Sequence, residues 1–373
     1  MKKIVFLTGT RADYGKLKSL ITMVEDAPDF EAHVFVTGMH MLHKYGFTVQ
    51  EVEKSDYKNI YKYINQHAAD TMDVILAKTI TGLSDYVKEV QPDMIVVHGD
   101  RVEAMAGAIV GSLNNILVSH IEGGEVSGTI DELIRHAVSK MAHLHYVSNE
   151  TAKKRLIQLG ETEKSINVIG SPDLDIMSSG SLPTLQEVRD RYDIPFDDFG
   201  VLMYHPVTTE LESLSDNIKC VVDAVIASNK NFVVIYPNND HGTDVIINEY
   251  KRFEGSENIR IFPSVRFECF LTLLKKAKIV IGNSSAGVRE APFYGIPSLD
   301  IGTRQKNRAT ALSIKNLKND SDTILTGIEV EYGNKYEKFF EFGNGESNKR
   351  FMNSVSSSSL WETEKQKVFV DKV

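Results

Sequence analysis

Short apolar, β-branched runs alternate with helical patterns along almost the whole chain, and this alternation limits the fold more than any other feature. Near-continuous apolar strands are typical of parallel sheets that helices cover on both faces. Segments between the runs, such as 16–27 and 268–277, space their apolar residues three and four apart, as amphipathic helices do. The sequence therefore predicts an α/β protein. The predicted strands are residues 3–9, 32–38, 93–99, 116–124, 144–149 and 166–171, followed after a break by 200–206, 232–238, 259–264, 277–283 and 296–302.

The series of strands is interrupted between residues 172 and 198, where Pro, Ser, Gly and acidic residues indicate a linker. A chain of 373 residues is too long for one ordinary core, because domains usually have about 100 to 200 residues. We therefore predict two doubly wound domains around a cleft. They comprise residues 1–171 and 172–373, and a final helix of the second can cross back to the first.

Composition excludes several classes of function. The formal net charge is −9 and Lys and Arg are not clustered, so nucleic acid is not an expected partner. No stretch approaches the roughly 18 apolar residues that span a bilayer. The apolar run near the N-terminus is shorter than that of a secretion signal, which has about 7 to 15 residues. Cys220 and Cys269 fit neither a disulfide framework nor a metal site. We expect a cytoplasmic protein that uses no membrane and no metal.

Polar and ionisable residues recur where the predicted strands end. In open parallel sheets, ligands bind beyond the carboxyl ends of the strands. Residues at these ends in both domains are therefore expected to share one large site. They are Arg11, Lys16, Asp100, Arg101 and Glu122 in the first domain, and His205, Asn283, Ser284 and Ser285 in the second.

Two strand-to-helix turns are candidate phosphate sites. GTRADYGK (9–16) places Arg11 and Lys16 near a helix start, and GNSSAGVRE (282–290) offers two serine hydroxyls with backbone N–H groups. The first turn matches neither the dinucleotide fingerprint nor a Walker loop. Each turn also has a simpler interpretation, a capped surface turn in the first and a capping box in the second. Glu290 could face a ribose diol or be an ordinary acid of a first helical turn.

Two carboxylates at the ends of buried strands are candidate acids or bases. Asp100 follows the strand that ends in VVHG, and Glu122 follows SHI. Burial raises the pKa of a carboxyl group and so makes it usable in proton transfer near neutral pH. The alternative for both residues is a buried ion pair with Arg101 or His120.

Further candidates lie on the helix ELIRHAV and in the second domain. Asp131 begins this helix, which also carries Arg135, and Asp131 is either an acid–base residue or a helix cap. His205 lies in YHPVTTE. A lone histidine is more often structural, but this one is expected to face the carboxylates from the opposite domain.

Several motifs together resemble the hydrolysing UDP-N-acetylglucosamine 2-epimerases, over about residues 3 to 310. These motifs are TGTRADYGKLKSL, VHGDRVEA, HIEGGEVSGTIDELIRHA, HPVTTE, GNSSAGVREAP and DIGTRQKNR. The third is highly specific. The family makes N-acetylmannosamine for sialic acid synthesis in bacteria. The resemblance implies two Rossmann-like domains around a UDP-sugar cleft, in a GT-B-like arrangement.

The resemblance also implies a reaction. UDP leaves C1 as the C2 proton is removed, which gives a bound 2-acetamidoglucal. Water then adds at C1, and a proton reaches the opposite face of C2. Proton transfers at two faces of one carbon need more than one placed carboxyl group. The negative charge that develops on the departing diphosphate needs cationic and hydroxyl donors.

Site residues follow by position in the family's motifs. Asp100, Glu122 and Asp131 match its catalytic acids, and His205 matches a histidine near the diphosphate. An aspartate at 131, where the non-hydrolysing relatives carry glutamate, supports hydrolysis. The implied contacts to the UDP-sugar are Arg11, Lys16, Arg101, Arg135, Ser284, Ser285 and Glu290. No cofactor and no metal are expected.

Four other functions fit parts of the pattern. They are a hydrolysing 2-epimerase of a UDP-diacetamido sugar such as UDP-diacetylbacillosamine, a non-hydrolysing epimerase, a GT-B glycosyltransferase, and a UDP-sugar sensor without catalysis. The intact set of acids argues against the sensor. Apolar helix faces in the first domain are compatible with a homodimer or homotetramer.

Overall fold

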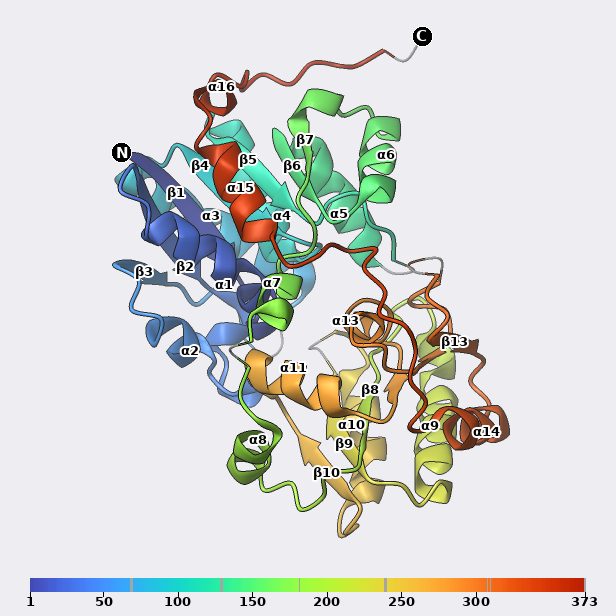
Figure 1. Cartoon of the computed structure of the whole chain (residues 1–373). Helices are drawn as coiled ribbons and strands as arrows, with labels where there is room; N and C mark the ends of the chain where they lie inside the picture. The colour runs from blue at the N-terminus through green and yellow to red at the C-terminus, as the bar shows by residue number, and fades with distance from the viewer. Residues whose placement is uncertain are drawn as a thin grey trace. The chain divides into compact units, whose positions relative to one another are not determined.

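The computed structural model describes residues 1–67, 70–127, 130–180, 182–237, 240–306, 308 and 310–371 (Figure 1). The chain divides into two units, each built around its own sheet. Unit 1 comprises Met1–Glu125, Asp131–Gly180 and Glu341–Val373, and unit 2 comprises Val126–Ile130 and Ser181–Phe340. None of the helices in the described ranges has both the length and the apolar character of a membrane span.

The sheet of unit 1 has the strand order β3-β2-β1-β4-β5-β6-β7, and its described neighbours are all parallel. This doubly wound order brings the carboxyl ends of all strands to one edge. The strands are β1 (Lys2–Thr8), β2 (Phe30–Val36), β3 (Asn59–Lys62), β4 (Met94–His98), β5 (Leu117–Ile121), β6 (Leu144–Val147) and β7 (Ile166–Val168). The helices with this sheet are α1 (Arg11–Glu25), α2 (Val49–Glu53), α3 (Met72–Val90), α4 (Val102–Leu113), α5 (Ile130–Met141), α6 (Glu150–Gln158), α7 (Asp173–Ser178), α15 (Ser347–Val355) and α16 (Ser358–Trp361).

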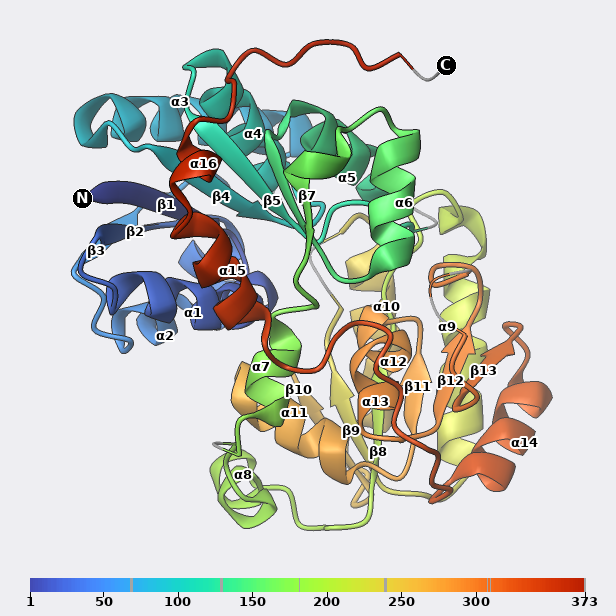
Figure 2. The same cartoon turned by 45° about the horizontal axis from the view of Figure 1, so that its top comes forward.

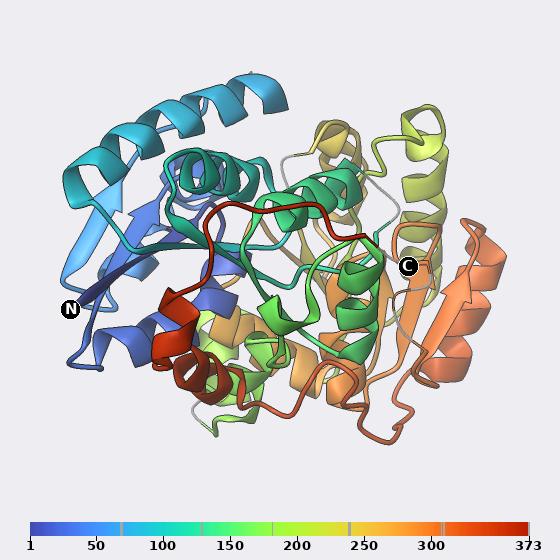
Figure 3. The ribbon, with the colours of Figure 1, turned by 90° about the horizontal axis from the view of Figure 1, so that it is seen from above.

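Helices cover both faces of this sheet, as its continuous apolar strands require. In β1, Ile4 and Phe6 pack in one cluster with α1 and α15, while Val5 and Leu7 pack in another with α3, α4 and α5. Side chains alternate between the two faces along a strand, so consecutive apolar residues supply both cores. Figure 3 shows the result from above, with α3 (cyan) and α15 (red) on opposite sides of the strands.

Unit 2 repeats the same plan with the order β10-β9-β8-β11-β12-β13, again with parallel neighbours (Figure 2). Its strands are β8 (Gly200–Met203), β9 (Phe232–Ile235), β10 (Ile259–Phe262), β11 (Val280–Gly282), β12 (Ser298–Ile301) and β13 (Ile314–Leu317). Its helices are α8 (Leu185–Tyr192), α9 (Leu214–Ala227), α10 (Thr243–Tyr250), α11 (Phe267–Lys276), α12 (Ser285–Val288), α13 (Glu290–Phe293) and α14 (Ser321–Glu331). Single 3₁₀ turns occur at Gly38–Met41, His43–Tyr45, Glu163–Ser165, Leu211–Ser213 and Lys251–Phe253.

The α/β prediction is confirmed, and every predicted strand overlaps an observed one. Asn238, at the end of the predicted strand 232–238, lies outside the described residues. The apolar pattern did not indicate β3 or β13. Each pairs with a single neighbour at a sheet edge, and each carries a lysine in a run of only 4 residues. Edge strands need no continuous apolar pattern, so their sequences resemble those of loops.

The units differ from the predicted ranges 1–171 and 172–373 in three segments: 172–180 and 341–373 belong to unit 1, and Val126–Ile130 belongs to unit 2. Phe351 and Val355 of α15 join the core that α1 forms. The Asp175 carboxylate accepts hydrogen bonds from the backbone N–H groups of Ser347 (2.7 Å) and Asn348 (2.9 Å), which begin α15. The last helices therefore complete the first core rather than the second.

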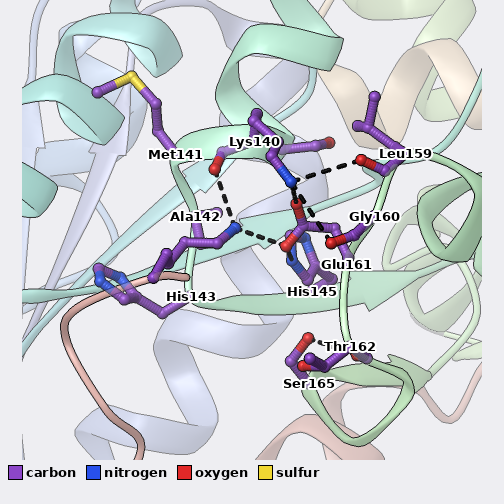
Figure 4. A network of polar contacts seen from close by, with 12 residues as sticks. Lys140, Met141, Ala142, His143, His145, Leu159, Gly160, Glu161, Thr162 and Ser165 are labelled. Carbon is purple, nitrogen blue, oxygen red and sulfur yellow. Dashed lines mark hydrogen bonds and ion pairs between the residues drawn. The ribbon is translucent and has the colours of Figure 1, made fainter. Parts of the chain in front are cut away.

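The C-terminal tail beyond α16 contacts a polar network around Glu161, in which Figure 4 labels Lys140, His145 and Glu161. The Lys365 carbonyl of this tail also lies 2.9 Å from Nε2 of His143. The Lys367 ammonium donates to the backbone carbonyls of Lys140 (2.9 Å) and Ala142 (2.6 Å) and to Oε2 of Glu161 (2.5 Å). Nε2 of His145 and the Lys140 ammonium, each 3.0 Å from a Glu161 oxygen, complete the group. A cation at the C-terminal end of α5 also complements the helix dipole.

Hydrogen bonds hold the pKa of Glu161 low although its side chain is buried. Burial alone would raise this pKa, but hydrogen bonds from His145 and Lys367 outweigh burial and lower the pKa to about 2, from the ordinary 4.5. A carboxylate with a depressed pKa stabilises the fold fully above its unfolded-state pKa. This contribution is lost as the pH falls from 4.5 toward 2.

Replacing Lys367 should therefore destabilise unit 1 in a pH-dependent way. We expect Lys367→Met to lower the free energy of unfolding by about 2 kcal/mol at pH 7, the usual value for hydrogen bonds to a charged group. The difference from wild type should shrink below pH 4.5, because Glu161 of the unfolded chain then binds a proton, whereas the folded carboxylate with its pKa of about 2 does not. Urea unfolding at pH 7 and pH 3 measures this change. Lys365→Met removes an exposed lysine from the same tail and serves as the control; an equal effect of both variants would contradict the assignment.

Candidate active site

Adjacent strands of unit 1 bring the candidate acids together. Strands β4 and β5 are neighbours in register, with His98 opposite Ile121 at their ends. Asp100 and Glu122 lie just beyond these two residues. The carboxyl ends of parallel strands are the usual place for a site in such sheets.

Glu122 has a constrained backbone. Its φ of 63° lies in the left-handed region, which is uncommon for residues other than glycine. Two hydrogen bonds hold it there: its N–H donates to the Tyr146 carbonyl (2.8 Å), and its own carbonyl accepts from the Arg135 guanidinium (2.7 Å). Strained backbone held in this way is typical of functional sites.

Side chains from three other residues contact the Glu122 carboxylate. Oε2 contacts the Lys16 ammonium at 3.3 Å and Nε2 of His98 at 3.0 Å, and Oε1 accepts a hydrogen bond from the Ser171 hydroxyl. Lys16 also pairs with the buried Asp173 (3.4 Å). With Glu122 only 2% exposed, these donors set the direction of the carboxylate within a buried cluster.

Arg135 links the two candidate acids. Its side chain is 5% exposed, and one nitrogen donates to the Asp100 carboxylate while another donates to the Glu122 carbonyl. Asp100 keeps 25% of its side chain exposed, so a substrate can reach it. The predicted grouping of Asp100, Glu122 and Arg135 is thus present within unit 1.

Asp131 lies in the first turn of α5, four residues before Arg135. Residues four apart share one face of a helix, so Asp131 lies one turn from the Arg135–Asp100 pair on the same face.

The printed ion pairs of the two acids involve partners that the sequence did not suggest. Asp100 pairs with Arg135, and Glu122 pairs with Lys16. The buried His120 bonds the Gly99 carbonyl (2.8 Å) and the Ser139 hydroxyl (3.0 Å). Burial lowers the pKa of His120 to about 3, so this ring is neutral near pH 7.

The glycines of HIEGG leave space for this packing. Gly124 has a φ of 75°, and a Cβ there would lie 2.3 Å from the Ala152 carbonyl oxygen. A Cβ on Gly123 would lie 2.8 Å from the Ser139 hydroxyl oxygen. Both glycines let the turn after β5 approach α5 and α6 closely.

Arg11 and Arg101 each have a carboxylate partner outside this cluster. Arg11 pairs with Glu51 at 2.9 Å, and Arg101 pairs with Glu103 at 3.3 Å. The turn at 9–16 also contains a cap, because the Thr10 side chain and Asp13 form a capping box at the start of α1. A cap and a ligand site are compatible, since both use the start of the helix.

In unit 2, Asn283 positions His205. The Asn283 side chain accepts from the His205 N–H (2.7 Å) and donates to the His205 carbonyl (2.9 Å), which joins the ends of β8 and β11. Burial lowers the pKa of His205 well below its ordinary value, and Arg304 lowers it further. The ring is therefore neutral near pH 7 and has one donor and one acceptor nitrogen.

The turn at 282–290 is not a capping box. Ser284 is the N-cap of α12 and its hydroxyl accepts from the Ala286 N–H at 3.4 Å, but the residue three positions on is a glycine. Glu290 instead begins the next short helix, α13, and is 4% exposed. The break between α12 and α13 separates Glu290 from the serines.

The structure adds residues that the sequence analysis did not select. Near Asn283, the side chains of Arg304 (3.3 Å) and Gln305 (2.8 Å) donate to its carbonyl. Burial raises the pKa of Asp300 in the same unit to about 7, against the opposing influence of Arg304 and Arg308. In unit 1 the added residues are His98, Ser171 and Asp173. Four of these residues could have been found from the sequence because they lie in motifs that carry the family resemblance. His98 lies in VHGDRVEA, and DIGTRQKNR contains Asp300, Arg304 and Gln305.

Within the described ranges, no cluster of three or more His, Cys, Asp or Glu side chains could hold a metal ion.

Two doubly wound parallel sheets, with acids at the strand ends of the first, define the chain as an α/β protein of the two-Rossmann, GT-B-like class. A solved UDP-GlcNAc 2-epimerase of Neisseria meningitidis, bound to UDP-GlcNAc, has this fold. Its TM-score to the chain is 0.81, at 19% identity over 95% of this chain and 99% of that one.

The chain belongs to the UDP-N-acetylglucosamine 2-epimerase family, whose model matches residues 22–356. It is 46% identical to a UDP-N-acetylglucosamine 2-epimerase of Neisseria meningitidis serogroup B, over 100% of this chain and 99% of the relative. A UDP-N,N'-diacetylbacillosamine 2-epimerase (hydrolyzing) of Legionella pneumophila is 33% identical, over 94% of each chain. The polysialic acid biosynthesis protein P7 of Escherichia coli is 34% identical, over 90% of this chain and 88% of that protein.

Proposed function

We propose that the protein is a hydrolysing epimerase that converts UDP-N-acetylglucosamine and water into N-acetylmannosamine and UDP. The observation that carries this proposal is the Asp100–Arg135–Glu122 group at the ends of β4 and β5. A protein that only bound the sugar nucleotide would gain little from buried acids fixed in this way, because acids repel a diphosphate. The relative at 46% identity is named UDP-N-acetylglucosamine 2-epimerase, which supports the substrate and the epimerisation.

The fixed acids suit the two proton transfers of the reaction. One carboxylate removes the C2 proton as the C1–O bond to UDP breaks, which leaves 2-acetamidoglucal. Water then adds at C1, and a carboxyl group returns a proton to the other face of C2. Asp100, Glu122 and Asp131 are the groups proposed for these steps. Carboxyl groups held in place lower the barrier because they need no reorganisation.

The departing diphosphate needs donors that act as its charge develops. We assign this role to Lys16 and Arg11 in unit 1 and to Ser284 and Ser285 in unit 2, with Glu290 on the ribose. A neutral His205 keeps one ring N–H group, which can donate a hydrogen bond to the leaving phosphate. Arg101 completes the proposed contacts to the substrate.

Hydrolysis, as opposed to reversible epimerisation, is supported by Asp131, whose side chain is shorter than the glutamate of the non-hydrolysing branch. The Legionella relative is named as hydrolysing. N-acetylmannosamine is a precursor of sialic acid, and the Escherichia coli relative is named for polysialic acid synthesis. We therefore place the reaction early in sialic acid and capsule synthesis, in the cytoplasm.

Proton NMR of the protein with UDP-N-acetylglucosamine in deuterated water tests this function. We expect free UDP together with N-acetylmannosamine that is deuterated at C2, since the proton returned to C2 when 2-acetamidoglucal is hydrated comes from the deuterated solvent. Intact UDP-sugar in equilibrium with its epimer would show a non-hydrolysing enzyme. Unchanged substrate over hours would contradict the choice of substrate.

UDP-N,N'-diacetylbacillosamine is the second candidate substrate, because a relative at 33% identity is named for it. The same NMR experiment with this sugar separates the two functions. We expect kcat/KM to favour UDP-N-acetylglucosamine by at least about tenfold, as a misplaced substituent in a sugar pocket costs about 1–3 kcal/mol. The reverse preference would assign the enzyme to diacetamido sugars.

A further inference from the structure

Two distant segments of unit 1 touch at a pair of glycines. Gly170 follows β7, and Gly343 lies in the segment that returns from unit 2. Both have positive φ, 90° and 118°, and a Cβ on Gly343 would lie 2.8 Å from Cα of Gly170. The two backbones can approach this closely only because neither residue has a side chain.

The next residue connects this crossing to Glu122. The backbone N–H of Ser171 donates to the carbonyl of Phe342 in the returning segment at 2.7 Å. The hydroxyl of Ser171, which is 1% exposed, donates to Oε1 of Glu122. One residue therefore joins the returning segment to the carboxylate.

Glu122 is surrounded by groups from several elements. Lys16 of α1 and His98 of β4 contact Oε2, and Arg135 of α5 contacts the backbone carbonyl. Asp173 and Asp100 lie behind Lys16 and Arg135, respectively. Lys16 and His98 thus contact one carboxylate oxygen, Oε2, and Ser171 donates a hydrogen bond to the other, Oε1.

We propose that Ser171 is a positioning residue, which the glycine crossing holds in place and which fixes the direction of the Glu122 carboxylate for proton transfer. This inference rests on the proposed function of Glu122. The terminal torsion of a glutamate is soft, so a carboxylate held at one oxygen can turn about that contact. A hydrogen bond at the second oxygen removes this freedom and keeps the proton-accepting lone pair aligned.

Ser171→Ala tests the hydroxyl directly. We expect kcat to fall about 10- to 100-fold with KM within about threefold, because Ser171 acts through Glu122 and does not bind substrate. The acid limb of the pH profile of kcat should also move to higher pH, since the lost hydrogen bond favoured the ionised carboxylate. Ser171→Thr keeps the hydroxyl and should restore most of the rate.

Ser165→Ala is the matched control, because Ser165 is also buried and its hydroxyl donates to a backbone carbonyl, that of Thr162, at 2.7 Å. Unchanged kcat and pH profile in Ser171→Ala, with only a lower melting temperature, would overturn the positioning role. That result would show that the serine serves the fold alone.

Gly343→Ala tests the crossing without changing the Ser171 side chain; the added methyl would lie 2.8 Å from Cα of Gly170 and 3.4 Å from the backbone nitrogen of Ser171. The added methyl should push the returning segment away and reproduce the loss of kcat and the shift of the pH profile. Gly255→Ala controls for the cost of positive φ, because Gly255 has a φ of 81° and no atom within 4 Å of an added Cβ. A fully active Gly343→Ala protein would overturn the role of the crossing.

Different results would contradict the positioning role of Ser171 and the proposed epimerase activity. If wild-type protein releases no UDP, the proposed function fails, and the catalytic role of Ser171 fails with it. If wild-type protein is active and Ser171→Ala matches it, only the positioning role fails. The coupling between the two side chains can also be measured without enzymatic activity. A double-mutant cycle compares the urea unfolding midpoints of Ser171→Ala, Glu122→Gln and the double variant. Additive midpoint shifts would show that the two side chains are not coupled.

Discussion

Glu122→Gln should lower the rate of UDP release by about 10³-fold or more while the protein stays folded. Glutamine has nearly the same shape, but its amide cannot take up or return a proton, and general acid–base catalysis is typically worth about 10²- to 10⁴-fold. The amide also places an N–H₂ group or a less basic oxygen against Lys16 and His98, which now contact a carboxylate oxygen. Steady-state release of UDP and C2 exchange by NMR measure the two half-reactions separately.

The matched control for this change is Glu132→Gln. Glu132 lies in the first turn of α5 with 35% of its side chain exposed and forms an ion pair with His136 at 3.4 Å. It is a glutamate of the same unit with no proposed role, so its replacement should leave kcat within about twofold, and surface substitutions of this kind usually change stability little. If Glu122→Gln kept more than about a tenth of the wild-type rate, Glu122 would not be an acid–base residue.

Arg135→Met should lower the free energy of unfolding by about 3–5 kcal/mol and also abolish activity. Arg135 is 4% exposed and pairs with Asp100, so its loss leaves a partly buried carboxylate without this cation. The Glu122 carbonyl would lose a hydrogen bond of 2.7 Å as well, at a residue whose backbone is already strained. Urea unfolding at pH 7 measures the destabilisation.

Two further variants show whether the lower stability of Arg135→Met comes from the unpaired charge of Asp100. Adding Asp100→Asn to Arg135→Met should recover part of the stability, because the unpaired charge is then removed. Arg252→Met removes an arginine whose side chain is 40% exposed and which pairs with Asp223 and Glu249. Exposed pairs contribute about 0–1 kcal/mol, so this control should change stability little. Equal effects of Arg135→Met and Arg252→Met would contradict the structural role of Arg135.

The fold could be predicted from local sequence because buried parallel strands need continuous apolar runs. The pattern located every strand of the two sheets except β3 and β13, and it indicated helices at 16–27 and 268–277. It also placed Asp100 and Glu122 at strand ends, because parallel strands put every carboxyl end at one edge. The edge strands β3 and β13 were missed, since a strand with one neighbour needs no such run.

The amino-acid sequence by itself therefore determined the α/β class, the repeated doubly wound plan and the candidate acids, all of which follow from short-range patterns. Only the tertiary structure decided which partners these acids have. Lys16 meets Glu122 across 106 positions, and α15 joins the core of unit 1 from the far end of the chain. Apolar periodicity shows which face of an element is buried. It does not show which distant side chain lies opposite, because that depends on how the sheets and helices pack.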